Sequence, residues 1–419
     1  RLELTLELTI DGTVIKVWGA NVKNFEMELL SYGFNGCLDF WVNDDTDLDG
    51  DSDDLLKEPF QTQKLIEMKL EIQVVRPDRK DTERDPDPLA IRGYVIEKYL
   101  FEQANRRGSA SPVAARRYGI KFCDAAQFFW GQHYPCELFT QKALKDVFDA
   151  HKGEKVSLVY NSESLNTQKP MIYVGLERDR THPASFYDYF LWIIDTHNLL
   201  LRYDFKENKY YLDDQKPADG EPVAMDFEDA FDFIQRFPDV PRWKPRIHNS
   251  YTESPATQLV DNEQMVTPLT QDFLLRTSLA GQLDARVTLE TARLKLPSPE
   301  VHLRCDRYPT RMIMPWDLID VTSDPQWDLA AIAVPDIALQ KKCRCHRLQI
   351  LSRAHSQGQE RREIGAMSEF AIQLQFAFEP IDETLGRLPR YVVPTYPSIV
   401  EGKIVSEIGA DEEETYDIE

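Results

Sequence analysis

The stretch Ser185–Leu212, SFYDYFLWIIDTHNLLLRYDFKENKYYL, decides the fold because it joins two hydrophobic periodicities. In its first half apolar residues recur at steps of three and four, which is typical of one helix face. Ser185 followed by Asp188 predicts the start of this helix, because a serine oxygen accepts a backbone N–H of the first turn. Asn198 favours the left-handed backbone that closes a helix. We expect a helix of about 12 residues, with an apolar face formed by Phe186, Tyr189, Phe190, Ile193, Ile194 and His197.

The second half of the stretch changes to a period of two. Residues 199–205 place Leu199, Leu201, Tyr203 and Phe205 on one side, which predicts a half-buried strand. Residues 206–209 are polar and predict a turn, and residues 210–212 predict the returning strand. The expected unit is helix, strand, turn, strand.

Length and charge limit the classes of protein. The chain has 419 residues, which at about 100 to 200 residues per domain predicts two to four domains. Its 49 basic and 71 acidic residues give a formal charge of −22, which disfavours binding to nucleic acid or anionic lipid. No apolar run approaches the roughly 18 residues that span a bilayer, and residues 1–4 resemble no signal peptide. We expect a cytoplasmically made protein without stable membrane insertion.

Residues 1–117 are expected to form a β domain. Leu2–Ile10 alternates without a break, and Asp11-Gly12 predicts a hairpin turn. Because closure removes unpaired strand edges, these strands favour a barrel-like sheet. The further predicted strands are Thr13–Trp18, Asn24–Tyr32, Gly36–Val42, Leu65–Val75 and Ile91–Glu102.

Residues 118–240 are expected to form an inserted α/β region. It begins with a predicted strand at Tyr118–Cys123, followed by the aromatic cluster Phe128-Phe129-Trp130. Large aromatic side chains dominate protein cores, so this cluster is interpreted as core rather than as a sugar-stacking platform. Thr140 is the predicted N-cap of a helix, whose apolar face would consist of Ala143, Leu144, Val147 and Phe148.

Residues 241–385 are expected to form a second β domain. Its predicted strands, beginning from Arg246, include Ala285–Leu296, Glu300–Arg304, Arg311–Ser323, Arg344–Arg353 and Glu369–Phe378. Residues 386–419 follow as a linker, in which Pro389, Pro394 and Pro397 predict a stiff extended segment.

Catalysis has no sequence anchor, so we expect no enzyme and assign no catalytic or cofactor-binding residue. Glu137 and Asp146 could form a glycosidase dyad only if they lie close together in space. His197 is interpreted as a helix C-terminal residue favoured by the helix dipole rather than as a catalyst.

Two stretches resemble metal sites, although we assign no metal ligand. In the acidic run Asp45–Asp54, the residues Asp45, Asp47, Asp49 and Gly50 match the start of a calcium loop, but Leu56 replaces its final glutamate. A solvated loop and a calcium-binding module are the alternatives. The second stretch combines Cys343, Cys345 and His346 without another ligand pair nearby, which disfavours zinc. The six dispersed cysteines are expected to be reduced thiols.

The central stretch resembles the S-D-[YF]-x-F-[LI] helix and aromatic hairpin of VgrG proteins and contractile phage tail hubs. Residues 118–148 are similar to the segment that precedes this helix in the family, although Glu137-Leu138 replaces its usual arginine. Residues 312–321 resemble a strand entry of the form l-x-P-G-d, with Trp316 in place of the glycine. Pro389–Gly409 is similar to the family's linker into an OB-fold. The resemblance covers nearly the whole chain in order.

The resemblance implies an α+β, mainly β fold, with two related barrel-like tube-forming β domains, an inserted α/β region and a linker into an OB-fold. It implies the structural hub and spike protein of a contractile injection system, such as type VI secretion, an extracellular injection particle or a phage tail. The implied partners are two further copies in a homotrimer, a hexameric inner tube protein, baseplate proteins, and a spike tip or effector cargo. Assembly in the cytoplasm would precede secretion or incorporation into a particle. A tail-associated cell-wall hydrolase on a β-rich frame is the alternative.

Overall fold

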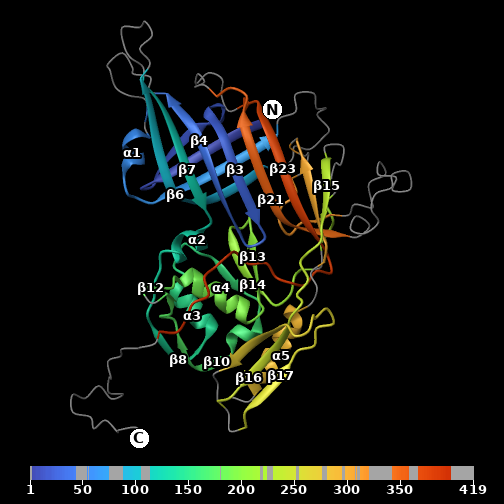
Figure 1. The fold of residues 1–419 in the computed structure, drawn as a ribbon. Helices are drawn as coiled ribbons and strands as arrows, with labels where there is room; N and C mark the ends of the chain where they lie inside the picture. The colour runs from blue at the N-terminus through green and yellow to red at the C-terminus, as the bar shows by residue number, and fades with distance from the viewer. Residues whose placement is uncertain are drawn as a thin grey trace, which may run out of the picture.

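The computed structural model describes residues 2–43, 54, 56–74, 88–104, 114–179, 181–217, 220–223, 230–251, 254–275, 281–294, 298–306, 308, 312–319, 342–357 and 367–397. Strands dominate this part of the chain and helices are few, which confirms the expected α+β, mainly β class. The strands of the large sheet lie at the top of Figure 1 with the short helix α1 (Lys57–Gln61) beside them, and the other α-helices lie below.

Thirteen of the described strands form one large sheet, in which β15-β19-β23-β21-β3-β4-β7-β6-β5-β1-β2 follow one another. Strands β20 and β22 pair with β21 and β1 respectively. The members are β1 (Leu2–Ile10), β2 (Thr13–Trp18), β3 (Val22–Leu30), β4 (Gly33–Asn43), β5 (Ile66–Val74), β6 (Leu89–Ala104), β7 (Ala114–Cys123), β15 (Ala230–Arg236), β19 (Glu300–Cys305), β20 (Leu318–Ile319), β21 (Cys343–Ala354), β22 (Met367–Ser368) and β23 (Phe370–Pro380).

These strands run in a circuit that strand pairing and one chain connection complete together. Leu2 of β1 pairs with Ser368 of β22, which lies just before β23 in the chain. Strand β23 pairs with β21, and β21 pairs with β3, so the circuit returns through β4, β7, β6 and β5 to β1. The expected barrel-like closure is therefore present, and strands from the far end of the chain complete it.

The two expected β regions share strands instead of forming separate sheets. Strands β15, β19, β23, β21 and β20 pair in sequence, and Val223, just before β15, bridges Ile319 of β20. Strands β21 and β23 thus belong both to this group of strands and to the circuit that includes β1. The predicted strand Tyr118–Cys123 is the second half of β7, which pairs with β4 and β6, so it lies in the large sheet.

The central unit has the predicted local structure. Helix α4 (Phe186–Thr196) begins at Ser185, whose Oγ accepts a hydrogen bond from the Asp188 amide over 3.1 Å. Asn198 closes the helix with φ at +52°. Strands β13 (Leu200–Asp204) and β14 (Lys209–Asp213) then form an antiparallel hairpin, in which Tyr203 lies opposite Tyr210.

Short helices and strands surround this unit. They are α2 (Ala125–Trp130), β8 (Leu138–Ala143), α3 (Leu144–His151), β9 (Leu158–Tyr160), β10 (Gln168–Tyr173), β11 (Glu177–Asp179) and β12 (His182–Pro183). Helix α1 (Lys57–Gln61) instead packs on the large sheet, where Phe60 contacts Tyr118 of β7. The prediction that Thr140 caps a helix was wrong, because residues 138–143 pair with β10 and the helix begins only at Leu144. Asp146 accepts a hydrogen bond from the Ala143 amide at that start, over 3.0 Å.

A small unit lies apart from the large sheet. It consists of β16 (Lys244–Asn249), β17 (Ala256–Leu259), β18 (Thr270–Leu275) and α5 (Gly281–Arg293). The predicted strand Ala285–Leu296 was wrong, since most of it is helical. Its apolar residues also fit a helical period, and Leu283, Val287 and Leu294 pack near Ile247 of β16. Arg246, where the second β region was expected to begin, lies in β16 of this small sheet.

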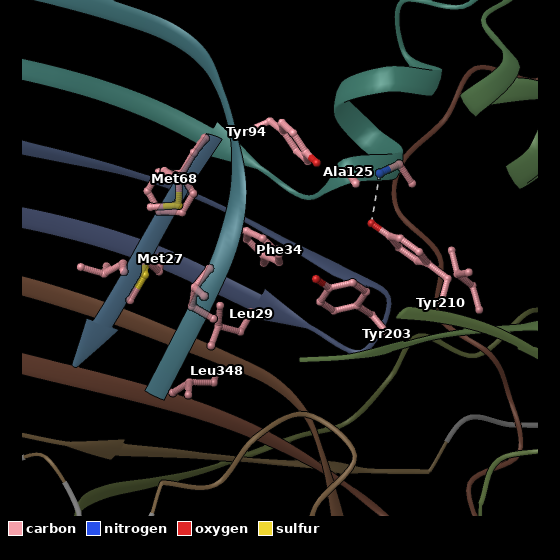
Figure 2. Packing of buried hydrophobic residues seen from close by; sticks show 14 of the residues in the cluster. Met27, Leu29, Phe34, Met68, Tyr94, Ala125, Tyr203, Tyr210 and Leu348 are labelled. Carbon is pink, nitrogen blue, oxygen red and sulfur yellow. Dashed lines mark hydrogen bonds between the residues drawn. The ribbon is translucent and has the colours of Figure 1, made fainter. Parts of the chain in front are cut away.

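One continuous hydrophobic core joins the large sheet to the α/β region. Figure 2 shows Phe34 of β4 facing Tyr203 of the central hairpin, and their ring centroids are 5.7 Å apart. Tyr210 accepts a hydrogen bond from the Ala126 amide at the start of α2 and donates one to the buried carboxylate of Asp124. The hairpin is therefore held against the sheet by apolar and polar contacts.

Candidate functional site

A cluster of buried and half-buried charges lies where β19, β21 and β23 meet residues 383–387 of the C-terminal chain. Glu379 of β23, only 1% exposed, accepts hydrogen bonds from Lys216, Arg344 and Arg387 over 2.7, 3.2 and 3.2 Å. Arg387 also donates to Glu300 of β19 over 2.5 Å. We call these five residues the ionic junction. It connects β19, β21 and β23 of the large sheet to Lys216, which precedes β15, and to Arg387, which follows β23.

The ionic junction controls the protonation of Glu300. Burial alone raises a carboxyl pKa, but the hydrogen bond from His302 and the charge of Arg387 lower the pKa of Glu300 to about 2. His346 also faces this carboxylate, with 3.9 Å between its Nε2 and the Glu300 Oε2. Burial, with the nearby charge of Arg387, lowers the pKa of His346 to about 3. The folded protein thus holds Glu300 ionised and His346 neutral near pH 7.

Residues 386–397, which we call the C-terminal strap, leave the ionic junction and cross helix α4. Figure 1 shows this segment in red, passing over α4. The Tyr391 hydroxyl donates to Asp195 at the end of α4 over 2.7 Å, and the Val392 amide donates to Asp188 near its start over 3.1 Å. Leu388 and Tyr391 also pack against the main core. The proline-rich linker is therefore docked along a helix.

The far end of the strap pairs with β11. The amides of Thr395 and Glu177 each donate to the carbonyl of the other residue over 2.8 Å. The ring of Tyr396 lies edge-on to Trp192 of α4, with 6.4 Å between the centroids. Residues 386–419 were predicted as a linker and the start of an OB-fold, and their part beyond residue 397 falls outside the described residues.

Trp316 occupies the position where the resembled family has glycine. Its φ of +82° lies in the left-handed region that glycine favours. Its indole N–H donates to the Ser31 carbonyl over 2.7 Å, and the guanidinium of Arg344 lies 6.0 Å from its ring. Trp316 thus connects the ionic junction to the turn between β3 and β4.

A groove of about 470 Å³ crosses the outer face of the large sheet. Tyr99 of β6 lines one side and Arg304 of β19 another, with Glu26, Asp39 and Arg353 among the residues between them. Asp39 of β4 accepts hydrogen bonds from Asn24 of β3 and Arg117 of β7, so its carboxylate links neighbouring strands of the sheet.

The sequence candidates for chemistry have structural partners. Glu137 is exposed, 3.9 Å from His151, whereas Asp146 accepts from the Ala143 amide in the N-terminal cap of α3. These two carboxylates thus have separate partners. The aromatic cluster forms α2, in which Trp130 is buried 4.5 Å from Phe190, ring centroid to ring centroid, as expected of core residues.

His197 lies at the predicted helix end, but its charge state differs from the expectation. Burial lowers the pKa of His197, which favours the neutral imidazole over the charged form that a helix dipole stabilises. Its Nδ1 lies 2.9 Å from the Ile193 carbonyl and its Nε2 lies 3.0 Å from the Lys169 ammonium. Since the ammonium can only donate, Nε2 accepts and Nδ1–H donates.

The metal candidates have different outcomes. Cys343, Cys345 and His346 are all buried in β21, and a bulge after Cys345 breaks the simple alternation of the strand. In the part of the chain that the structure describes, no three His, Cys, Asp or Glu residues are grouped to hold a metal. The calcium-loop candidates Asp45, Asp47, Asp49 and Gly50 lie outside the described residues.

Asp54, the last residue of the acidic run, is not part of a solvated loop. Its side chain is completely buried and accepts hydrogen bonds from Arg116 over 3.1 Å and Tyr118 over 2.7 Å. Burial, with the contact to Asp54, raises the pKa of the Tyr118 hydroxyl. Asp54 therefore anchors this end of the acidic run to β7.

Sequence reasoning missed the ionic junction and the docking of the strap. The one signal was a charged residue near the end of each of two strand patterns, Arg344 and Glu379. These residues lie directly opposite each other in the β21–β23 register, which the sequence does not display.

The fold and these contacts define a β-rich α+β protein organised around packing and ion pairs. Comparison with solved structures identifies similar folds. A chain of the lidless PdpA-VgrG complex aligns with a TM-score of 0.63 and 13% identity, over 93% of this chain and 67% of that one. A chain of the lidded Francisella PdpA-VgrG complex aligns with a TM-score of 0.61 and 15% identity, over 98% of this chain and 57% of that one.

A prophage tail protein aligns over almost its whole length. The 43 kDa tail protein of prophage MuSo2 from Shewanella oneidensis aligns with a TM-score of 0.52 and 10% identity, over 90% of this chain and 99% of that one. No family model and no curated protein matches the sequence. The chain therefore has a VgrG-like tail protein fold. Among the described helices, none has the length and apolar character needed to cross a bilayer.

Proposed function

We propose that this chain is the hub portion of the spike of a contractile injection system, which caps the inner tube and carries the puncturing tip. The observation that carries this proposal is the shared fold, which extends over 93% of this chain for a PdpA-VgrG complex and over 99% of a prophage tail protein. The system would be type VI secretion, an extracellular injection particle or a phage tail. Its role would be structural, without turnover of a substrate.

The functional unit in this proposal is a homotrimer with cyclic symmetry. Each copy would contribute the two strand groups that share β21 and β23, so that three copies supply six groups to a ring. Such a ring would meet a hexameric inner tube protein on one side, with baseplate proteins around it. The C-terminal strap would lead into an OB-fold and the spike tip or effector cargo.

The location of the protein follows from this role. Assembly would take place in the cytoplasm, followed by secretion or by incorporation into a particle. The strongly acidic charge of −22 disfavours nucleic acid as a partner, and we propose no stable membrane insertion.

The test is the molar mass of the natural protein that contains this chain, measured by light scattering at micromolar concentration. Three subunit masses are the expected result, and a single subunit mass would overturn the proposal. Zymography on peptidoglycan tests the structural role separately. We expect no clearing, whereas clearing would favour the alternative of a tail-associated cell-wall hydrolase.

A further inference from the structure

We infer that strand β2 of one copy pairs with strand β15 of a neighbouring copy, so that the large sheets of successive copies join edge to edge. The inference rests on the proposed function, because a cyclic trimer repeats one contact between two different surfaces three times. It goes further by naming the two strands that meet, their relative direction and their register.

The first argument is that the large sheet has two terminal strands. Among the described strands, β2 pairs only with β1 and β15 pairs only with β19, so each has one edge without a strand partner. These two strands do not pair with each other within one copy. A strand edge presents a row of backbone N–H and C=O groups that can pair with another chain. Two different edges at opposite ends of one sheet fit a contact in which β2 of each copy meets β15 of the next.

The second argument concerns the exposed face of β2, which carries an apolar and a basic residue. Val14 is 53% exposed, and the side chain of Lys16 is 70% exposed. Lys16 lies opposite Glu7 of β1 and pairs with its carboxylate over 3.1 Å. Strand β1 buries its leucines on the other side, so Val14 and Lys16 lie on the outer face of the sheet.

The exposed face of β15 carries a matching acidic and apolar pair. Asp232 lies opposite Arg304 of β19, with 3.9 Å between the carboxylate and the guanidinium, and its side chain is 47% exposed. Ile234, two residues further on, is 60% exposed, and the exposed Arg236 follows it. These three residues lie on the outer face, because successive side chains of a strand alternate between its two sides.

The third argument is that a single register matches both pairs. If β2 and β15 run antiparallel with Lys16 opposite Asp232, then Val14 lies opposite Ile234. Unlike charges and apolar side chains stabilise a sheet when they lie directly opposite each other, whereas like charges destabilise it. A parallel pairing with Val14 opposite Ile234 would place Lys16 opposite Arg236, two positive charges. An antiparallel shift by two residues would place Val14 opposite Arg236 and leave Lys16 opposite Ile234.

Disulfide cross-linking of the natural protein that contains this chain tests the register. Val14→Cys and Ile234→Cys are combined in a Cys136→Ser background, because Cys136 is the exposed one of the six cysteines. Opposite residues of an antiparallel pair have Cα atoms about 4.5 to 5.5 Å apart, a separation that a disulfide can bridge. Mild oxidation should therefore give covalent dimers and trimers on a non-reducing gel.

The matched control for cross-linking moves one cysteine along the same face. Val14→Cys with Arg236→Cys is two residues out of register, which separates the Cα atoms by about 7 Å or more, beyond the reach of most disulfides. This pair should give at least about tenfold less covalent product. Either cysteine alone should give no more product than the Cys136→Ser background.

Charge reversal tests the same register without cysteines. Lys16→Asp and Asp232→Lys each place like charges opposite each other, and each should raise the protein concentration at half-assembly about tenfold. The double variant restores an unlike pair, so its assembly should return toward that of the wild type. Lys121→Asp is the matched control, because it removes an exposed lysine from β7, which lies between the two terminal strands in the sheet. It should leave assembly unchanged.

The inference is overturned if the two cysteine pairs cross-link equally well, if one cysteine alone suffices, or if the double charge variant assembles no better than the single ones. These outcomes are separate from the mass measurement. A trimer that shows any of them refutes this inference alone. A protein that is monomeric at micromolar concentration, but whose Val14→Cys and Ile234→Cys pair cross-links at higher concentration, refutes the proposed function alone.

Discussion

Replacement of Glu300 by glutamine should remove stability in a pH-dependent way. Burial alone would raise the pKa of Glu300. The hydrogen bond from His302 and the charge of Arg387 outweigh burial, so folding lowers this pKa from 4.5 to about 2. A shift of that size corresponds to about 3 kcal/mol of unfolding free energy at neutral pH. The side chain is only 14% exposed, so solvent screening reduces this value little.

The sign follows from linkage. Because the folded pKa is below the unfolded one, the stability from this carboxylate is complete above about pH 4.5 and is lost as the pH falls toward 2. Urea unfolding of the wild type and Glu300→Gln should therefore differ by about 3 kcal/mol at pH 6 and converge toward pH 2. The control Glu97→Gln removes an exposed pair with Lys121 and should cost less than about 1 kcal/mol. A difference that stays constant across this range, or that grows on acidification, would refute the assignment.

Three further substitutions test other parts of the fold. Asp54→Asn removes the buried carboxylate shared by Arg116 and Tyr118, although Glu102 still pairs with Arg116, and should cost about 1 to 3 kcal/mol in chemical denaturation. Asp11→Asn, in an exposed pair with Lys64, should cost under about 1 kcal/mol, and equal costs would contradict the burial argument. Gly36→Ala places a methyl group 2.7 Å from the Glu26 carbonyl and should lower the free energy of unfolding by about 1 to 3 kcal/mol, while Gly281→Ala, with open space around it, should be neutral or stabilising. Trp316→Phe removes the indole donor to Ser31 and should cost about 1 kcal/mol or more by the same measurement; an unchanged stability would show that this hydrogen bond contributes nothing.

The local elements were accessible to sequence reasoning where one signal dominated. The helix at Ser185, its end at Asn198 and the hairpin after it follow from a capping residue, a left-handed residue and a change of period. The same reasoning failed for α5, because its apolar residues fit both a period of two and a helical period. It also failed at Thr140, where a favourable capping residue lies inside a strand. Tertiary pairing with β10 overrides the local preference there.

Sequence alone determined the mainly β composition of the chain, the central helix and hairpin, and the alternation of strands such as β1. Only the tertiary structure decided that β22 pairs with β1 and that β21 pairs with β3. It also decided that Glu379 accepts hydrogen bonds from Lys216, Arg344 and Arg387. The physical reason is that periodicity and capping act between neighbours in the chain, whereas the register of strands hundreds of residues apart depends on which buried faces and charges meet in space.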